Sequence, residues 1–450
     1  MLRYFLEKPS PLKRYVVNFL AKTAGYAAEE SSSANGAHLF YGNNADCDCP
    51  VKIPERSSDT LWAELLSNRY VGSLGRLPFD IISATGAFLT DEVNAGERAY
   101  DIHDRLVFES SFQASHSCQK LAVVNAYARV FRDALVPVIG QGLPLWPRGQ
   151  QAAIGLSHDV DRLDRWAAVR ETLRTHRYPE SAAISIVRNF LWPHDDSQLF
   201  REVLDYEHHL GFKSTFFFAA TSRYDVGANT QDVPYSIHAP VVRNAIEYVL
   251  NRGFEVGLHA SYNALRSAEH LRAERERLAK VSQAPVIGLR HHFWHTGRDL
   301  SYALALHEKA GFSYDTSIAW NSNAGFRRSV ASYYRPWHPG ERREIDVLQL
   351  PVFAMDGNFF YHKGITAEAA TESLMGLVGE IVRYNGMGVV DWHSDTSHPN
   401  TPAYREWGRA YFDFLQQLSL VPDVWVTSLG EIATWLCERE RRLTYLECSS

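Results

Sequence analysis

The chain has 450 residues, 45% of them hydrophobic and 22% charged, which is the composition of a globular protein long enough for two domains. Its formal net charge of −6 argues against nucleic acid as a partner. No apolar run reaches the roughly 18–20 residues that cross a bilayer. The N-terminal segment also lacks the apolar core of a signal peptide. We therefore expect no integral membrane segment and a cytoplasmic protein.

The first 148 residues have a mixed pattern. Residues 1–30 predict a helical segment broken by Pro9 and Pro11, and helical patterns with one apolar stretch follow between residues 60 and 135. Glycines and prolines then cluster in residues 140–149, which predicts a linker. We therefore divide the chain into an N-terminal mixed α/β domain, residues 1–148, and a second domain, residues 149–450.

The second domain alternates short apolar runs with amphipathic helices. The helices are predicted at residues 197–210, 239–252 and 268–281. The apolar runs occupy residues 152–157, 213–219, 253–258, 284–289, 312–318, 347–353, 386–392 and 423–428. Alternating strands and helices give parallel strands with right-handed crossovers. The pattern predicts an α/β fold, an irregular (β/α) barrel of seven or eight strands.

Chemically active side chains follow four of these runs. They are Asp159 and Asp161 in SHDVD, His259 after FEVGL, Arg290 to His292 in GLRHH, and His393 in VVDWHSD. The carboxyl ends of parallel strands meet at one end of a barrel, so we expect these groups to converge. Each residue alone has an ordinary structural explanation, such as a helix cap or a loop histidine. Only their occurrence together predicts a site.

The residue types suggest which of these groups bind a metal and which transfer protons. Asp159 and Asp161 are two positions apart, so both side chains lie on one face of the strand. One can bind a divalent metal and the other can take a proton from water. His259 is a second plausible ligand, because neutral imidazole suits Zn²⁺. Arg290 would keep the free carboxylate ionised, and His393 could protonate a leaving amine.

Five motifs, taken in their order along the chain, resemble the polysaccharide deacetylases, the family-four carbohydrate esterases related to nodulation chitooligosaccharide deacetylases. The motifs are SHDVD, STFFF, FEVGLHASYNA, GLRHHF and VVDWHSD. The resemblance covers roughly residues 150–437. It implies an irregular (β/α) barrel that removes acetyl groups from sugars with a divalent metal, usually Zn²⁺.

The resemblance assigns a role to each matching residue. Asp159 matches the general base, and Asp161 matches the first metal ligand. His259 matches the first histidine of the metal-binding motif. Arg290 matches the arginine that pairs with the base, and His393 matches the general acid. By the same resemblance, the acid that orients this histidine would fall on Asp315, in FSYDTSIAW.

The sequence departs from the family at the third metal ligand. The family's second metal-binding histidine falls on Asn263, and an amide oxygen is a weaker zinc ligand than imidazole. His292 offers a replacement on the next strand end. These departures, with GFR at 325–327 and MDGNFF at 355–360, resemble a divergent bacterial branch with an upstream α/β domain. The third ligand is therefore either Asn263 or His292.

Trp294, Trp320 and Trp392 fall near the expected barrel mouth. Sugars stack on aromatic rings, so these three residues are candidates for substrate binding, although tryptophan also fills ordinary packing positions.

Three functions compete. The first is a metal-dependent hydrolase that removes an acetyl group from an N-acetylated carbohydrate or glycan intermediate. The second is hydrolysis of another non-peptide C–N bond by the same groups. The third is a metal-free protein that binds glycan or serves as a scaffold in polysaccharide biosynthesis. The N-terminal domain could recruit a partner protein or cover one end of the barrel.

Overall fold

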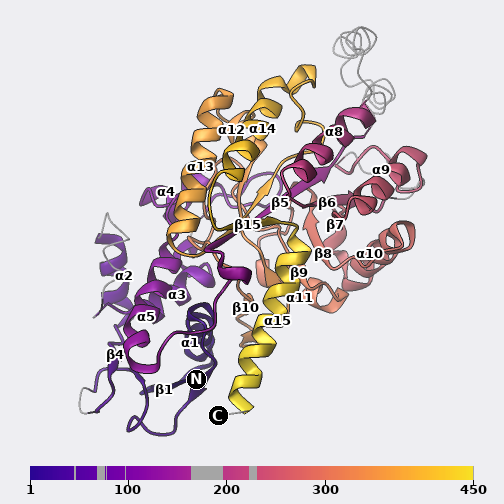
Figure 1. The fold of residues 1–450 in the computed structure, drawn as a ribbon. Coiled ribbons are helices and arrows are strands. Elements are labelled where there is room, and N and C mark those ends of the chain that lie inside the picture. The colour runs from indigo at the N-terminus through magenta and orange to yellow at the C-terminus, as the bar shows by residue number, and fades with distance from the viewer. Residues whose placement is uncertain are drawn as a thin grey trace.

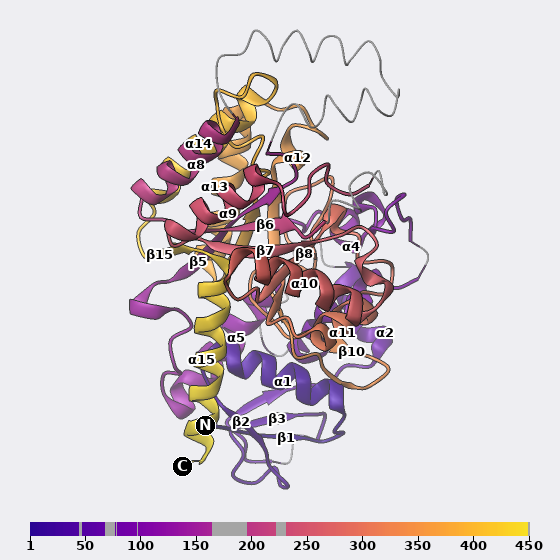
Figure 2. The ribbon, with the colours of Figure 1, turned by 90° about the vertical axis from the view of Figure 1, so that its right-hand side faces the viewer.

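The computed structural model describes residues 1–44, 47–67, 77, 79–96, 98–163, 196–221 and 231–448. A small N-terminal sheet with its helices lies beside a larger curled sheet that is surrounded by helices (Figure 1, Figure 2). The predicted combination of an α/β barrel and an N-terminal mixed α/β region is confirmed.

The N-terminal sheet is parallel, in the order β2-β1-β3-β4. Its strands are β1 (Leu2–Leu6), β2 (Ala28–Glu30), β3 (Leu39–Tyr41) and β4 (Val51–Ile53). Its helices are α1 (Pro11–Ala24), α2 (Ser58–Ser67), α3 (Ile81–Leu89), α4 (Phe112–Ser115) and α5 (Val123–Ile139).

The predicted helical segment over residues 1–30 is wrong in its first part. Leu2, Tyr4 and Leu6 are buried at every second position, which is the period of a strand. Pro11 begins α1 and does not break a helix, because the first helical position needs no backbone N–H. The side chain of Ser10 caps the helix by accepting a hydrogen bond from Lys13 N.

The second domain contains the barrel. Its strands are β5 (Ala152–Val160), β6 (Ser214–Ala219), β7 (Glu255–Ala260), β8 (Gly288–His291), β9 (Tyr314–Asp315), β12 (Leu348–Gln349), β13 (Val352–Met355), β14 (Met387–Asp391) and β15 (Val424–Thr427), with a separate hairpin of β10 (Trp337–His338) and β11 (Arg343–Glu344). Its helices are α8 (Asp196–His209), α9 (Pro240–Asn251), α10 (Ala268–Ser282), α11 (Leu300–Ala310), α12 (Asp356–Phe359), α13 (Ala367–Arg383), α14 (Arg405–Ser419) and α15 (Leu429–Cys448).

One stretch of chain closes the barrel. The strand order is β12-β9-β8-β7-β6-β5-β14-β13, with β15 also paired to β5, and all these pairings are parallel. The two edge strands, β12 and β13, are separated in sequence only by Leu350 and Pro351. Leu350 N donates to Asp315 O at 3.0 Å, and Pro351 O accepts from Val389 N at 2.9 Å. This segment therefore joins the two ends of the strand order and closes the barrel.

The N-terminal region packs against the barrel domain through a part-buried ion pair and a shared core. Arg327 donates to both carboxylate oxygens of Asp91, at 2.8 and 2.7 Å. The Arg327 guanidinium also lies 4.5 Å from the centre of the Trp320 ring. Val330 and Tyr334 belong to the apolar core of the N-terminal region. The predicted boundary at residue 148 lies just before β5 and stays a prediction.

The C-terminal helix α15 runs back from the barrel toward the N-terminal sheet (Figure 1, Figure 2). Trp435 Nε1 donates to Leu145 O at 2.9 Å, and Arg439 Nε donates to Pro144 O at 2.8 Å. This helix thereby fixes the linker between the two regions. Among the described helices, none has the length and apolar character that crossing a membrane requires.

A buried polar network supports β5 from its outer face. His158 Nε2 lies 2.8 Å from Glu207 Oε1 on α8, and Tyr411 OH on α14 donates to the same oxygen at 2.6 Å. All three side chains are buried. Successive side chains of a strand point to opposite faces, so this network fixes the strand whose other face carries Asp159.

Candidate metal and acid–base site

Three side chains at the carboxyl ends of β5, β7 and β8 form a group that could hold a metal ion. Asp161, His259 and His292 each offer one ligand atom, and these atoms lie within 4.8 Å of one another. Asp161 Oδ1 is 3.2 Å from His259 Nε2, and Asp161 Oδ2 is 3.5 Å from His292 Nε2. Asp161 Oδ1 and His259 Nε2 are buried and make no hydrogen bond, despite their short separation. Two ligand atoms of a common ion would be arranged in this way.

The donor set suits a divalent metal. One carboxylate and two imidazoles leave a fourth position open, as in catalytic zinc sites. Burial lowers the pKa of His259, but Asp159 and Asp161 outweigh this and raise it to about 9. In the metal-free protein His259 therefore carries a proton at neutral pH. A metal ion must displace that proton, so metal affinity is expected to rise with pH.

Asp159 lies beside this group and is held by a buried arginine. Arg290 Nη1 donates to Asp159 Oδ1 at 2.8 Å, and Arg290 Nη2 donates to Ser157 Oγ at 2.7 Å. Asp159 Oδ2 lies 3.8 Å from His259 Nε2, next to the ligand atoms. Burial raises the pKa of Asp159, but Arg290 and His259 outweigh it and hold the pKa below its ordinary value. Asp159 is thus ionised at neutral pH with one oxygen directed at the site.

Arg290 also contacts a second carboxylate, Asp391 at the end of β14, at 2.8 Å. Burial raises the pKa of Asp391 to about 7, although Arg290 opposes this. One buried arginine therefore lies between two buried carboxyl groups, of which Asp159 has the lower pKa.

His393 follows β14 and is held by Asp356. Its Nδ1 lies 3.0 Å from Asp356 Oδ1, and its backbone N donates to Asp356 Oδ2 at 3.1 Å. Its Nε2 lies 3.8 Å from Asp161 Oδ2. Burial lowers the pKa of His393, but Asp356 outweighs it and raises the pKa well above its ordinary value. His393 is therefore a protonated donor beside the ligand atoms.

The prediction that Asp315 orients His393 is wrong. The Asp315 carboxylate accepts hydrogen bonds from Ser317 N at 2.9 Å and Ser317 Oγ at 2.7 Å, and lies 3.4 Å from His307 Nδ1. β9, which carries Asp315, does not pair with β14, whereas β13 does. Asp356 directly follows β13, so reading every strand end in turn would have identified it.

We expect Asp356→Asn to lower the pKa of His393, because the amide removes the negative charge that favours the imidazolium. An NMR titration of the imidazole resonances in the metal-free protein measures this pKa. Asp315→Asn is the matched control, because it removes a buried carboxylate that does not contact His393, and it should leave the pKa unchanged. An unchanged His393 pKa in Asp356→Asn would contradict the assignment.

The three tryptophans proposed for sugar binding are buried. Trp392 is 0% exposed and packs against Phe359 and Tyr411 on the outer face of β14. Trp320 is 2% exposed and lies against Phe108 of the N-terminal region, and Trp294 is 5% exposed. None of the three presents a ring to a substrate, so their predicted role is corrected to one in packing.

Asn263 lies beyond the end of β7, at the start of a short 3-10 helix, η5 (Ala264–Arg266). The three-atom ligand group forms without it, because His292 supplies the third atom. The choice of His292 over Asn263 as the third ligand stays a prediction.

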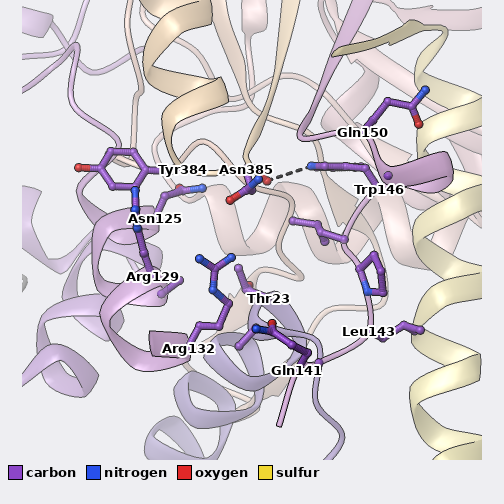
Figure 3. A pocket seen from close by; sticks show the side chains of 16 residues that line it. Thr23, Asn125, Arg129, Arg132, Gln141, Leu143, Trp146, Gln150, Tyr384 and Asn385 are labelled. Atoms are coloured by element: carbon purple, nitrogen blue, oxygen red, sulfur yellow. Dashed lines mark hydrogen bonds between the residues drawn. The ribbon is translucent and has the colours of Figure 1, made fainter. Parts of the chain in front are cut away.

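A cavity of about 390 Å³ lies elsewhere, between α1, α5, the linker and the end of α13 (Figure 3). Gln150 and Asn385, which line it, precede β5 and β14, so it lies at the amino ends of the barrel strands. Its two guanidinium groups have protein partners. Arg129 donates to the last carbonyl of α13, and Arg132 donates to Asp133. The cavity therefore belongs to the domain junction and not to the site at the carboxyl ends.

The strand order and the ligand group define a parallel (β/α)-barrel protein with a candidate divalent-metal centre. The sequence matches no protein-family model and no curated protein. Its structure is similar to one from Mycobacterium smegmatis assigned as a polysaccharide deacetylase, with 17% identity, a TM-score of 0.46, and 66% of this chain and 93% of the other covered.

Two further structures are similar to a comparable extent. One is the Puue allantoinase, with 14% identity, a TM-score of 0.43, and coverage of 66% of this chain and 94% of the other. The other, from Pseudomonas aeruginosa PAO1, is also assigned as a polysaccharide deacetylase, with 15% identity, a TM-score of 0.42, and coverage of 67% and 96%. At these identities the reaction has to be inferred from the side chains of the site.

Proposed function

We propose that the protein is a zinc-dependent hydrolase that removes an acetyl group from an N-acetylated carbohydrate or glycan intermediate. One observation carries this proposal. The ionised Asp159 and the protonated His393 both lie within 4 Å of atoms of the ligand group Asp161, His259 and His292. A metal-binding group flanked by a base and an acid is the arrangement that amide hydrolysis needs.

Zinc bound to this group would make water a nucleophile at neutral pH and stabilise negative charge on the amide oxygen. Asp159 Oδ2 accepts the proton that the water loses, while Arg290 keeps Oδ1 engaged and the carboxyl group ionised. His393 donates its Nε2 proton to the departing amine, and Asp356 retains the other ring nitrogen in place. Each proton transfer thus has its own residue, with Asp159 as the acceptor and His393 as the donor.

The motif resemblance over residues 150–437 supports the choice of a carbohydrate substrate. A second candidate is hydrolysis of another non-peptide C–N bond. The burial of Trp294, Trp320 and Trp392 favours it, because these three described tryptophans offer no exposed ring on which a sugar could stack. The acid and the base would serve either substrate.

The test is acetate release from a panel of N-acetylated sugars and oligosaccharides by the zinc-loaded protein. We expect Asp159→Asn to lower the rate about 10²- to 10⁴-fold, the usual contribution of a general base, with unchanged zinc content. Asp346→Asn, on a side chain 82% exposed, is the control and should keep the wild-type rate. Full activity of Asp159→Asn would refute the mechanism. Hydrolysis of other amides without acetate release would select the second candidate.

A further inference from the structure

A hairpin of the N-terminal region reaches the carboxyl end of the barrel. Tyr100 and Leu106 form an antiparallel bridge at its base. The Asp101 carboxylate accepts hydrogen bonds from the backbone N of His103 at 2.9 Å and of Arg105 at 3.1 Å, and from Arg105 Nε at 2.8 Å. The carboxylate of Asp101 therefore fixes the shape of the hairpin tip and the direction of the Arg105 side chain.

The turn that carries His292 has a strained backbone. His292 is the first residue of the 3-10 helix η6 (His292–Trp294). The next two residues, Phe293 and Trp294, have φ angles of 57° and 49°. Residues other than glycine disfavour this left-handed region, because their Cβ atom is crowded there. Two such residues in succession need support from their surroundings. The position of the His292 imidazole thus depends on what holds this turn.

The hairpin tip supplies that support. Arg105 Nη1 donates to Phe293 O at 2.9 Å, and the His103 ring stacks on the Phe293 ring with centres 4.6 Å apart and an interplanar angle of 18°. His103 Nδ1 also lies 3.0 Å from the hydroxyl of Tyr262, in the loop after β7. Tyr262 in turn stacks on His295 with centres 4.1 Å apart. The tip therefore joins the two loops that follow the strands of the histidine ligands.

We propose that the hairpin 100–106 is a positioning element for the metal centre. Through its bond to Phe293 O, Arg105 holds the strained turn in the form that places His292 against Asp161. Arg105 touches no ligand atom, so it is a positioning residue and not a catalytic one. The inference rests on the proposed function, because it presupposes that the ligand group binds zinc. It also gives the N-terminal region a role, which is to complete the geometry of a site in the barrel.

Zinc affinity of the full-length protein, measured by competition with a chromophoric chelator, tests this proposal. We expect Arg105→Ala to bind zinc about 10- to 100-fold more weakly, which is the usual effect of losing a group that orients a metal ligand. Arg105→Lys should recover part of the affinity, because an ammonium group can still donate to the carbonyl. The visible absorption of the cobalt-loaded protein should also change in Arg105→Ala, because this signal reports ligand geometry.

Arg298→Ala is the matched control. Arg298 pairs with Asp104 at 2.8 Å, so it also joins the hairpin to the barrel, but it is 65% exposed, and within the described part of the chain it makes no hydrogen bond to residues 292–294. The zinc affinity of Arg298→Ala should equal that of the wild type. His103→Ala gives an independent test through the ring contact and should also weaken zinc binding, even if Arg105→Ala fails to fold.

The outcomes separate the two proposals. A wild-type protein that binds no zinc overturns the proposed function and this inference together. A wild type that binds zinc, with equal affinity in Arg105→Ala and His103→Ala, overturns the positioning role alone. An equal loss in Arg298→Ala and Arg105→Ala would also overturn it, because the effect would then belong to docking of the hairpin in general.

Discussion

We expect Asp161→Ala to lose its bound zinc and to lower acetate release on the order of 10³-fold or more. Asp161 contacts both histidines of the ligand group, so its removal leaves two neutral ligands, which hold zinc poorly. A metal ion contributes several kcal/mol to the stabilisation of developing charge, and about 1.4 kcal/mol corresponds to a factor of ten in rate. The measurement is elemental analysis after addition of zinc. The wild type should hold roughly one zinc ion per chain, as a catalytic zinc site does.

Two companion variants make this experiment decisive for the third ligand. His292→Ala should lose zinc as Asp161→Ala does, and Asn263→Ala should retain it. Zinc retained in His292→Ala and lost in Asn263→Ala would reverse the assignment. Zinc retained in Asp161→Ala would exclude the site altogether.

We expect Arg290→Met to lower the free energy of unfolding by about 3–5 kcal/mol at pH 7, the usual effect of removing one partner of a buried ion pair. Arg290 is 0% exposed and lies 2.8 Å from both Asp159 and Asp391. Methionine fills similar space but leaves both carboxylates without a counter-charge. Denaturant unfolding measures the change. Arg298→Met is the control, because an exposed pair contributes only about 0–1 kcal/mol.

The loss in free energy of unfolding caused by Arg290→Met should depend on pH. The pKa of Asp391 is about 7 in the fold, against an ordinary value of about 3.9, so the folded state binds the extra proton between these values. The contribution of Asp391 to the stability of the fold therefore falls as the pH rises from about 3.9 to about 7. Without Arg290 the pKa of both carboxyl groups rises, so each takes up a proton at a higher pH than in the wild type, and a neutral carboxyl group tolerates burial better. The loss should be smaller at pH 5 than at pH 8, and a loss independent of pH would contradict this account.

Much of the barrel could be predicted from local pattern. The predicted helices at 197–210, 239–252 and 268–281 match α8, α9 and α10 closely, because an apolar stripe and a stop signal are local properties. The run 347–353 was predicted as one strand but is divided into β12 and β13. Its two halves pair with strands on opposite edges, and pairing between distant segments leaves no local trace in the sequence.

The site was predictable to the extent that it follows strand ends. Six of the predicted residues lie together, because the carboxyl ends of parallel strands meet. They are Asp159, Asp161, His259, Arg290, His292 and His393. Asp356 was missed and Asp315 was chosen in its place, since the neighbour of β14 depends on how the barrel closes. The tryptophans were misjudged because the sequence does not show which face of a strand end the N-terminal region and the outer helices cover.

The hairpin contact was beyond sequence reasoning for a different reason. Arg105 and Phe293 are 188 positions apart, and neither residue type signals a hydrogen bond from a side chain to a backbone carbonyl. The strained φ angles after His292 are likewise visible only in the backbone.

The pairing of β5 has a consequence for synthesis on the ribosome. β5 ends at Val160, whereas its partners β14 and β15 end at Asp391 and Thr427, so the last of them emerges about 270 residues later. At roughly 5–20 residues per second, β5 stays without β14 on one edge and without β15 on the other for tens of seconds during translation. An unpaired strand edge invites association with other chains. Substitutions that weaken β14 or β15 should therefore reduce the yield of soluble protein made in cells, even where the finished molecule is stable.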